Sequence, residues 1–535
     1  SLKNWIWSTT GQYDFTVKER HNLSVLAGVE QQRGTNKSYG LNRIQVNDPE
    51  FTNIQGGWTT PNIAGLGIGE NYLVSQFGRL NYNFDKRFFL SGNIRRDGAS
   101  QLGLNRKYGI FWGASAGWEI AREQFWEKSK LSDIFSSMKL RASYGRVGNI
   151  AGLGNFASLS TFGSGLYGQN GTLVFNAVGN PNLGWERSTK LDVGINFGFL
   201  NDRITGEFSY YNNNIDDLIL FVPAPPSAGL PGSIPTNVGT MFNRGVEFAI
   251  NAEIIRKRDF SWSASFNINY NKNEVTSLAP GLPRVLTSTS GLETVNITIP
   301  GQPVGMLYVT RTNGVDPATG RRIFINNQGR EVFYSFRTPA NGFNFQFADG
   351  TRAPNVSAAD AVAYRTGIPK YVGGFDNTFR FKGLELNTLF TYQLGFWIYW
   401  GTYAGLRDQR FWNNSVDVLR RWQKPGDMTD MPRPYFGDNV SNGSAFPLDI
   451  NVFKGDFLKL RTLQLSYNIP AKLVQKAKLS SFRVYAAGNN LLIITKYPGP
   501  DPEVSSNGTG TTNQGVDRNT VGNARTLTFG INVGL

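Results

Sequence analysis

The stretch between Phe396 and Trp412 concentrates side chains that are suited to bind a ligand. Tryptophan and tyrosine rings offer flat apolar faces, and the planar guanidinium group of arginine can donate two parallel hydrogen bonds to one acceptor group. This combination suits the recognition of a glycan or a peptide. The candidate ligand-binding residues are Trp397, Tyr399, Trp400, Tyr403, Arg407, Arg410 and Trp412.

Residues for catalysis or metal binding are scarce. The chain of 535 residues has no Cys, and its single His, His21, follows the charged residues 18–20 in a turn where we expect it to be solvated. Thiolate chemistry is therefore excluded, and a Ser/His/Asp arrangement or a His-rich metal site lacks its histidines. The glycine-rich residues 163–171 lack the lysine and the strand-to-helix context of a phosphate loop. We expect no catalytic residue, no bound metal, no cofactor and no enzymatic activity.

The charge of the chain indicates a membrane surface more than a nucleic acid. The formal net charge is +15, with 54 Lys and Arg against 39 Asp and Glu. These basic residues are scattered over turns and loops, whereas a nucleic-acid interface would gather them in a stripe. We expect no nucleic-acid partner, and attraction to an anionic membrane surface explains the charge better.

The elements that must position the candidate site are β-strands. In residues 191–199 the side chains of Leu191, Val193 and Ile195 alternate with polar residues and glycine, and residues 204–210 repeat the pattern after a short turn. Alternation with a period of two places apolar side chains on one face of a strand and polar ones on the other. Each arm has the length of about ten residues that a tilted strand needs to cross a bilayer, whereas strands of soluble sandwiches usually have about five or six.

The same pattern recurs along the chain and predicts an all-β fold. About 15 strands alternate between short turns and long loops, which is typical of an antiparallel transmembrane β-barrel with long extracellular loops. The predicted long loops are 33–70, 149–184, 222–236 and 275–368, and residues 322–325 and 332–336 are expected to form small strands outside the membrane. The predicted spanning strands are 5–15, 23–30, 74–84, 88–95, 110–120, 139–147, 191–199, 204–210, 245–254, 260–272, 371–381, 384–393, 457–469, 482–491 and 526–535.

Alternation also assigns the two faces of these strands. It predicts that the apolar side chains face lipid and that their polar neighbours face the interior. A shift of one residue in the strand register would exchange the two sets. The apolar side chains of this prediction are Phe208, Phe266 and Ile268, and the polar ones are Glu207, Asn267 and Asn269.

The number of strands predicts that residues 1–535 form part of a barrel. Bacterial single-chain barrels have an even number of antiparallel strands, so about 15 strands would leave two strands of the same direction at the seam. We therefore expect at least one further strand outside these residues. An exported protein also needs a signal peptide, and Ser1 leads straight into a strand.

Five short motifs, taken in series, resemble the SusC-like (RagA-like) TonB-dependent outer-membrane transporters of Bacteroidota. The resemblance covers essentially the whole chain. It implies a barrel of 22 strands, of which this chain would hold about 15, together with an N-terminal plug and a TonB box that are absent from residues 1–535. The motifs are RDGAS at 96–100, YGRVGN at 144–149, NPNLGWE at 180–186, NRGVE at 243–247 and PDPEV at 500–504.

The resemblance also implies partners. Family members pair with a SusD-like surface lipoprotein that closes over the barrel as a lid, and the TonB–ExbB–ExbD complex energises them through the N-terminal region. Outer-membrane lipid and lipopolysaccharide would surround the barrel. Two departures from the family stand out: residues 326–330 lack the carboxylates that calcium favours, and the chain ends in Leu535 where an aromatic residue is usual.

These observations together predict a component of an active outer-membrane importer for oligomeric nutrients, glycans or peptides. The alternative is a passive porin-like channel or a surface adhesion barrel. The aromatic stretch at 396–412 keeps two alternatives of its own, an outer aromatic girdle and a contact with the lid protein.

Overall fold

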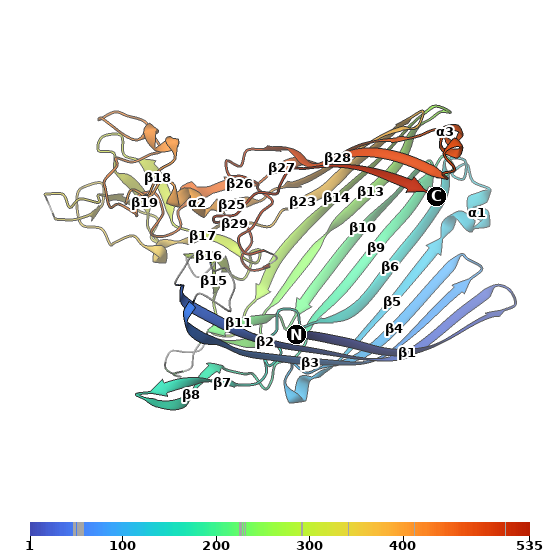
Figure 1. Ribbon diagram of the computed structural model, residues 1–535, viewed down its shortest axis with the longest axis horizontal. Helices are drawn as coiled ribbons and strands as arrows, with labels where there is room; N and C mark the ends of the chain where they lie inside the picture. The colour runs from blue at the N-terminus through green and yellow to red at the C-terminus, as the bar shows by residue number, and fades with distance from the viewer. Residues whose placement is uncertain are drawn as a thin grey trace. The chain divides into compact units, whose positions relative to one another are not determined.

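A computed structural model of residues 1–535 describes the chain except for residues 47–49, 51–57, 224–226, 228, 230–231, 290–292, 341, 411 and 509 (Figure 1). Fifteen strands form one sheet in the order β1-β2-β3-β4-β5-β6-β9-β10-β13-β14-β23-β24-β27-β28-β30. Neighbouring strands of this sheet, such as β1 with β2 and β14 with β23, pair antiparallel. The predicted all-β antiparallel fold and its number of strands are therefore confirmed.

The strands of this sheet are β1 (Leu2–Val17), β2 (His21–Val46), β3 (Trp58–Phe84), β4 (Phe88–Ala99), β5 (Tyr108–Glu119), β6 (Phe135–Asn149), β9 (Glu186–Phe199), β10 (Ile204–Asp216), β13 (Thr240–Arg256), β14 (Phe260–Ser277), β23 (Tyr371–Phe381), β24 (Leu384–Leu394), β27 (Phe457–Asn468), β28 (Ser481–Thr495) and β30 (Thr526–Gly534). The short α-helices are α1 (Gln124–Glu127), α2 (Gly401–Gly405) and α3 (Ala471–Lys476). Across the described ranges, no helix has the length and apolar character needed to span a bilayer.

The chain divides into two compact units, which are described separately. The first comprises residues 1–128, 139–193 and 213–240, and the second comprises residues 129–138, 194–212 and 241–535.

In the first unit, directly paired residues of β1 to β6 form rows of one chemical character. One row is apolar: Phe15, Leu23, Tyr82, Leu90, Ala116 and Ala142. The row shifted by one residue is polar: Asp14, Ser24, Asn81, Ser91, Ser115 and Ser143. Because neighbouring residues of a strand point to opposite faces, the sheet has one apolar and one polar face here.

The second unit shows the same separation. Its apolar row contains Trp262, Phe379, Leu386, Leu465, Ala486 and Phe529, and the adjacent row contains Ser263, Thr378, Asn387, Gln464, Ala487 and Thr528. Phe266 pairs with Phe375, whereas the neighbouring Asn267 accepts a hydrogen bond from the Gly374 amide at 3.1 Å. Asn269 donates to Glu247 at 2.6 Å. The predicted alternation of faces is confirmed.

Three of the predicted loops contain more structure than expected. Strands β2 and β3 extend through most of the predicted loop 33–70, although residues 47–49 and 51–57 lie outside the described part. The predicted loop 149–184 contains the strands β7 (Thr161–Tyr167) and β8 (Asn170–Ala177). The predicted loop 222–236 contains most of β12 (Ser233–Asn237) and the end of β11 (Ile219–Pro223). The backbone ladder continues beyond the alternating segments because pairing itself does not need one apolar face.

Small sheets also occupy the long connections of the second unit. Strands β15 (Val285–Thr289), β16 (Glu293–Thr298), β17 (Met306–Val309) and β22 (Val362–Arg365) form one sheet. A second contains β18 (Arg311–Val315), β19 (Arg322–Ile325), β20 (Glu331–Tyr334) and β21 (Phe345–Gln346). The small strands predicted at 322–325 and 332–336 are thus present, the latter beginning one residue earlier and ending two residues earlier than predicted.

Candidate functional site

The candidate stretch lies in a third small sheet of the second unit (Figure 1). Strand β25 (Trp397–Trp400) pairs antiparallel with β26 (Val452–Lys454) and parallel with β29 (Val516–Asp517), and helix α2 follows it directly. This pairing lies outside the fifteen-stranded sheet, which argues against the aromatic-girdle alternative. It also shows that residues far apart in the sequence build the site.

Tyr399 lies in the interior of this sheet region. Its side chain is fully buried among Val295, Leu307, Val309, Val452 and Val516. The Tyr399 hydroxyl donates a hydrogen bond to the Glu293 carboxylate at 3.3 Å, and burial raises the pKa of both groups. Tyr399 therefore anchors β25 to β16.

Trp400 and Tyr403 stack on each other on the opposite side of β25. Their ring centroids lie 4.7 Å apart at an interplanar angle of 10°, and the rings of Phe453 and Tyr497 contact Trp400 edge-on. The Tyr403 hydroxyl donates to Asp417 at 2.7 Å. Both rings are held by intramolecular contacts.

Arg407 is a buried cation. Its guanidinium carbon lies 4.0 Å from the centre of the Tyr403 ring, and Nη2 donates to the Asn451 side chain. Burial lowers the pKa of Arg407, since the charged form is costly away from water. Stacking on an aromatic face compensates part of that cost.

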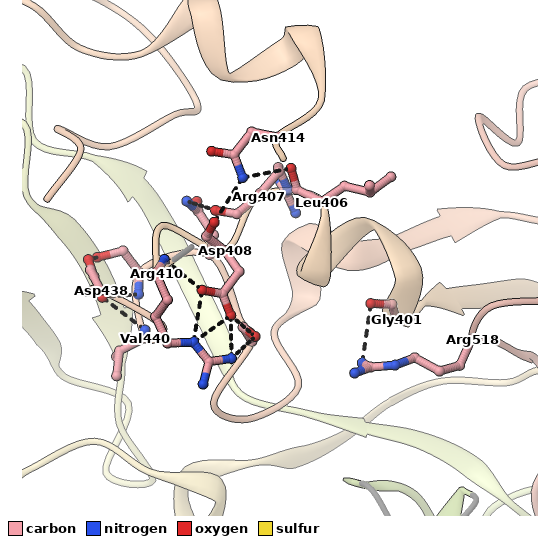
Figure 2. Close-up of polar contacts among 12 residues, drawn as sticks. Gly401, Leu406, Arg407, Asp408, Arg410, Asn414, Asp438, Val440 and Arg518 are labelled. Atoms are coloured by element: carbon pink, nitrogen blue, oxygen red, sulfur yellow. Dashed lines mark hydrogen bonds and ion pairs between the residues drawn. The ribbon is translucent and has the colours of Figure 1, made fainter. Parts of the chain in front are cut away.

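Arg410 forms a two-pronged contact with Asp408 (Figure 2). Arg410 Nε lies 3.0 Å from both carboxylate oxygens, and Nη2 lies 2.5 Å from Oδ2. Burial by itself would raise the pKa of Asp408, but hydrogen bonds from Arg410 and Ser444 hold it below its ordinary value. Asn414 donates to the carbonyl oxygens of Leu406 and Asp408, which fixes the loop around this pair.

Trp397 and Trp412 differ from the buried members of the predicted set. Trp412 is 56% exposed. Trp397 is half-buried and lines a cavity of about 460 Å³. The cavity lies where β14 ends and β24 ends, next to the long loops that follow these strands. These two rings therefore retain surface that a ligand can reach.

The cavity at Trp397 is surrounded by basic side chains that the sequence did not single out. The guanidinium carbon of Arg365 lies 4.9 Å from the Trp397 ring centre, and the Lys454 ammonium lies 5.9 Å from it. Lys272 and Lys370 line the cavity as well, and Lys272 forms an ion pair of 2.8 Å with Glu274. No local motif joins these residues, because they come from separate segments of the chain.

The geometry thus divides the predicted set into two groups. Trp397 and Trp412 keep accessible ring surface, and Trp397 presents its ring to a cationic cavity. The other five make intramolecular contacts that order the loop sheet: Tyr399, Trp400, Tyr403, Arg407 and Arg410. An aromatic face beside two or more cations can stack on a sugar or peptide group and attract its negative charges. Ligand binding by these residues stays a prediction.

Comparison with known proteins assigns the chain to a class. A family model described as TonB dependent receptor-like, beta-barrel, matches residues 2–491. The chain therefore belongs to the TonB-dependent receptor β-barrel family, and it is an outer-membrane protein.

Individual relatives agree with this assignment. TonB-dependent receptor P3 of Formosa agariphila is 31% identical over 527 residues, which cover 96% of this chain and 50% of that protein. TonB-dependent receptor SusC of Bacteroides thetaiotaomicron is 27% identical over 482 residues, covering 86% of this chain and 44% of that protein. The chain spans about half the length of the curated relatives it matches.

A solved structure extends the similarity to the fold. A structure of the RagAB peptide transporter superposes with a TM-score of 0.83 and 25% sequence identity, covering 99% of this chain and 55% of the other. The predicted resemblance to SusC-like and RagA-like proteins is confirmed by these findings.

Proposed function

We propose that this chain is part of an active importer of oligomeric nutrients. The proposal is supported by the relatives named TonB-dependent receptor SusC and RagAB peptide transporter, each of which matches along most of this chain. In this proposal residues 1–535 supply about 15 strands of a 22-strand barrel. The plug and the TonB box belong to a region outside these residues.

The partners of this importer follow from the same proposal. A SusD-like surface lipoprotein would close over the long loops, and the TonB–ExbB–ExbD complex would act through the plug. The barrel wall and the loop sheets would then hold substrate under the closed lid until TonB pulls on the plug. The ordered loop sheets of the second unit suit this task because their tyrosine and arginine side chains are already held in place by intramolecular contacts.

The cavity at Trp397 is the observation that carries the binding step. Its wall combines the half-buried Trp397 ring with Arg365, Lys272 and Lys370, and Glu274 is the carboxylate among its lining residues. An excess of cations favours an oligomer that carries negative groups, such as an acidic glycan or an acidic peptide. Stacking on Trp397 supplies the apolar part of recognition.

Calorimetric titration of the purified full-length protein tests this binding step. Acidic and neutral oligosaccharides and acidic and basic peptides of similar length serve as ligands. Trp397→Ala and Arg365→Ala should each weaken binding of the acidic ligand by about tenfold, the loss of one charge-assisted or stacking contact. Phe436→Ala serves as a control for an exposed ring outside the cavity and should leave the affinity unchanged. Equal affinity of the wild type and both cavity variants would contradict the proposal.

Energy dependence separates active import from a passive channel. Uptake by intact cells should stop when the proton-motive force is collapsed or TonB is deleted. A passive porin-like barrel would continue to admit the same oligomer under both conditions.

A further inference from the structure

Two arginine side chains on the apolar face of the first unit have no carboxylate partner. Arg96 pairs with Ile110 across β4 and β5, and Arg146 pairs with Trp112 across β5 and β6. Arg96 contacts the Tyr108 ring at 4.1 Å, and Arg146 Nε donates to the Thr189 hydroxyl at 3.4 Å. Neither forms an ion pair with a carboxylate of the described residues.

Other arginines nearby differ from Arg96 and Arg146, because they form ion pairs with carboxylates. Arg95, the neighbour of Arg96 in the chain, points to the polar face and contacts Asp97 at 2.6 Å and Glu30 at 3.2 Å. Arg33 lies on the same apolar face as Arg96 but forms an ion pair with Glu70. The sheet therefore neutralises these arginines and leaves Arg96 and Arg146 available.

The surroundings of the two arginines are those of a membrane interface. Each lies three residues before the end of its strand, on the side away from the short turn that precedes β4. Because long loops of bacterial barrels are extracellular, this end faces the outer leaflet. The exposed apolar side chains around them are Ile94, Tyr108, Ile110, Trp112 and Tyr144.

An apolar groove begins directly beside Arg96. A hollow of about 610 Å³ is lined by Gly11, Ala27, Gly78, Ile94 and Ile110 together with Arg96. Gly11, Ala27 and Gly78 are direct partners on three adjacent strands, so on β1, β2 and β3 no side chain longer than a methyl group lies at this level. Since Gly78 pairs with Ile94, the groove lies two residues below Arg96, toward the middle of the membrane.

A second apolar hollow lies on the same face and reaches Tyr144, two residues before Arg146 on β6. It has about 620 Å³ and is lined by Leu80, Leu90, Gly92, Ala114, Ala142 and Tyr144, among others. Tyr144 packs edge-on against Trp112 with ring centroids 5.7 Å apart. Arg96 thus lines the first hollow, and Arg146 lies two residues beyond Tyr144, which lines the second, on the same face of β6. Both hollows are wide enough to accept an acyl chain.

We propose that this face of β1 to β6 is a binding site for an anionic glycolipid of the outer leaflet, whose phosphate groups contact Arg96 and Arg146 and whose acyl chains fill the two hollows. Guanidinium groups bind phosphate through paired, charge-assisted hydrogen bonds, and a nearby apolar medium strengthens them. Neighbouring strands lie about 4.8 Å apart and a strand rises about 3.4 Å per residue. Two strand spacings and an offset of two residues along β5 therefore place the two cations about 12 Å apart at the backbone. A large headgroup with several anionic groups fits this spacing better than a single phosphate.

The test measures lipid retained by the full-length protein extracted from the outer membrane in mild detergent. Native mass spectrometry and phosphate analysis give the amount of lipopolysaccharide bound per protein. Arg96→Gln with Arg146→Gln should reduce the retained glycolipid by about tenfold or more, because each substitution removes a charge-assisted contact. Arg33→Gln, on the same face but already neutralised by Glu70, should leave retention unchanged.

Two further variants separate charge from shape. Gly11→Leu and Gly92→Leu fill the hollows without altering charge, and a Cβ atom at either position meets no atom within 4 Å. Both should reduce retention. Arg96→Lys with Arg146→Lys should retain more glycolipid than the double glutamine variant but less than the wild type, because lysine keeps the charge and loses the paired contact. Equal retention in the wild type and the double glutamine variant would overturn the proposal, as would retention of zwitterionic phospholipid in place of the glycolipid.

Discussion

Lys459 offers the sharpest test of how the long loops are attached to the strands. Its side chain is 2% exposed, and the ammonium group lies 2.9 Å from Asp501 and 2.8 Å from Glu503. Asp501 also accepts hydrogen bonds from the side chain and the amide of Asn523, at 2.9 Å and 3.1 Å. This network fixes the connection between β28 and β30 against β27.

Replacing Lys459 by methionine removes the cation and keeps most of the side-chain volume. Two largely buried carboxylates then lose their main compensating charge, although Arg461 still contacts Glu503. Breaking a buried pair by removing one partner costs about 3–5 kcal/mol. Arg380→Met provides the control, because Arg380 is 60% exposed and its partner Glu385 keeps a second ion pair with Arg483. Loss of a solvent-exposed contact of this kind costs about 0–1 kcal/mol.

The measurement is equilibrium unfolding by urea of the protein folded in lipid vesicles. Lys459→Met should lower the free energy of unfolding by about 3–5 kcal/mol at pH 7. In a background with Asp501→Asn and Glu503→Gln the same substitution should cost far less. If Lys459→Met lowered the free energy of unfolding equally in both backgrounds, the unpaired carboxylates would not be the cause of the loss. That result would refute the reasoning.

The effect should also depend on pH. Burial alone would raise the pKa of Asp501 and Glu503, but contacts with Lys459 lower both values below the ordinary range. Backbone hydrogen bonds lower the pKa of Asp501 further, and Arg461 lowers that of Glu503. Such groups stabilise the fold above their unfolded pKa of about 4, and this stabilisation is lost as the pH falls through the folded value. The deficit of Lys459→Met should therefore shrink on acidification below about pH 4.

Three further predictions concern the two faces, the close contacts and the loops. Phe266→Arg should destabilise the protein in lipid by about 2–4 kcal/mol if it lies near the middle of the membrane, and Asn267→Arg should cost much less; equal losses in a refolding assay would contradict the assignment of faces. Gly245→Ala should cost about 1–3 kcal/mol in urea unfolding, since its Cβ atom would lie 1.8 Å from the Tyr270 carbonyl oxygen, whereas Gly11→Ala should be neutral. Protease added to intact cells should cleave within 275–368 unless a lid covers it; cleavage confined to the short turns would reverse the topology.

The sequence by itself determined the sheet. Alternation of apolar and polar residues is a local property, so it predicted all fifteen strands and the two faces without knowledge of their partners. It failed toward the loop ends of some strands, as in residues 33–46 of β2, because alternation ends there while the backbone ladder continues.

Only the tertiary structure decided which aromatic and charged residues of the candidate site are accessible. Tyr399 and Trp397 belong to the same strand and have similar chemistry, yet one is buried among valines and the other lines a cavity. That difference depends on β16, β26 and β29, which are distant in the sequence, as are Lys459 and its partners Asp501 and Glu503. Burial and ion pairing are properties of such assembled surroundings, and a period along the chain carries no information about which distant segment will cover a given side chain.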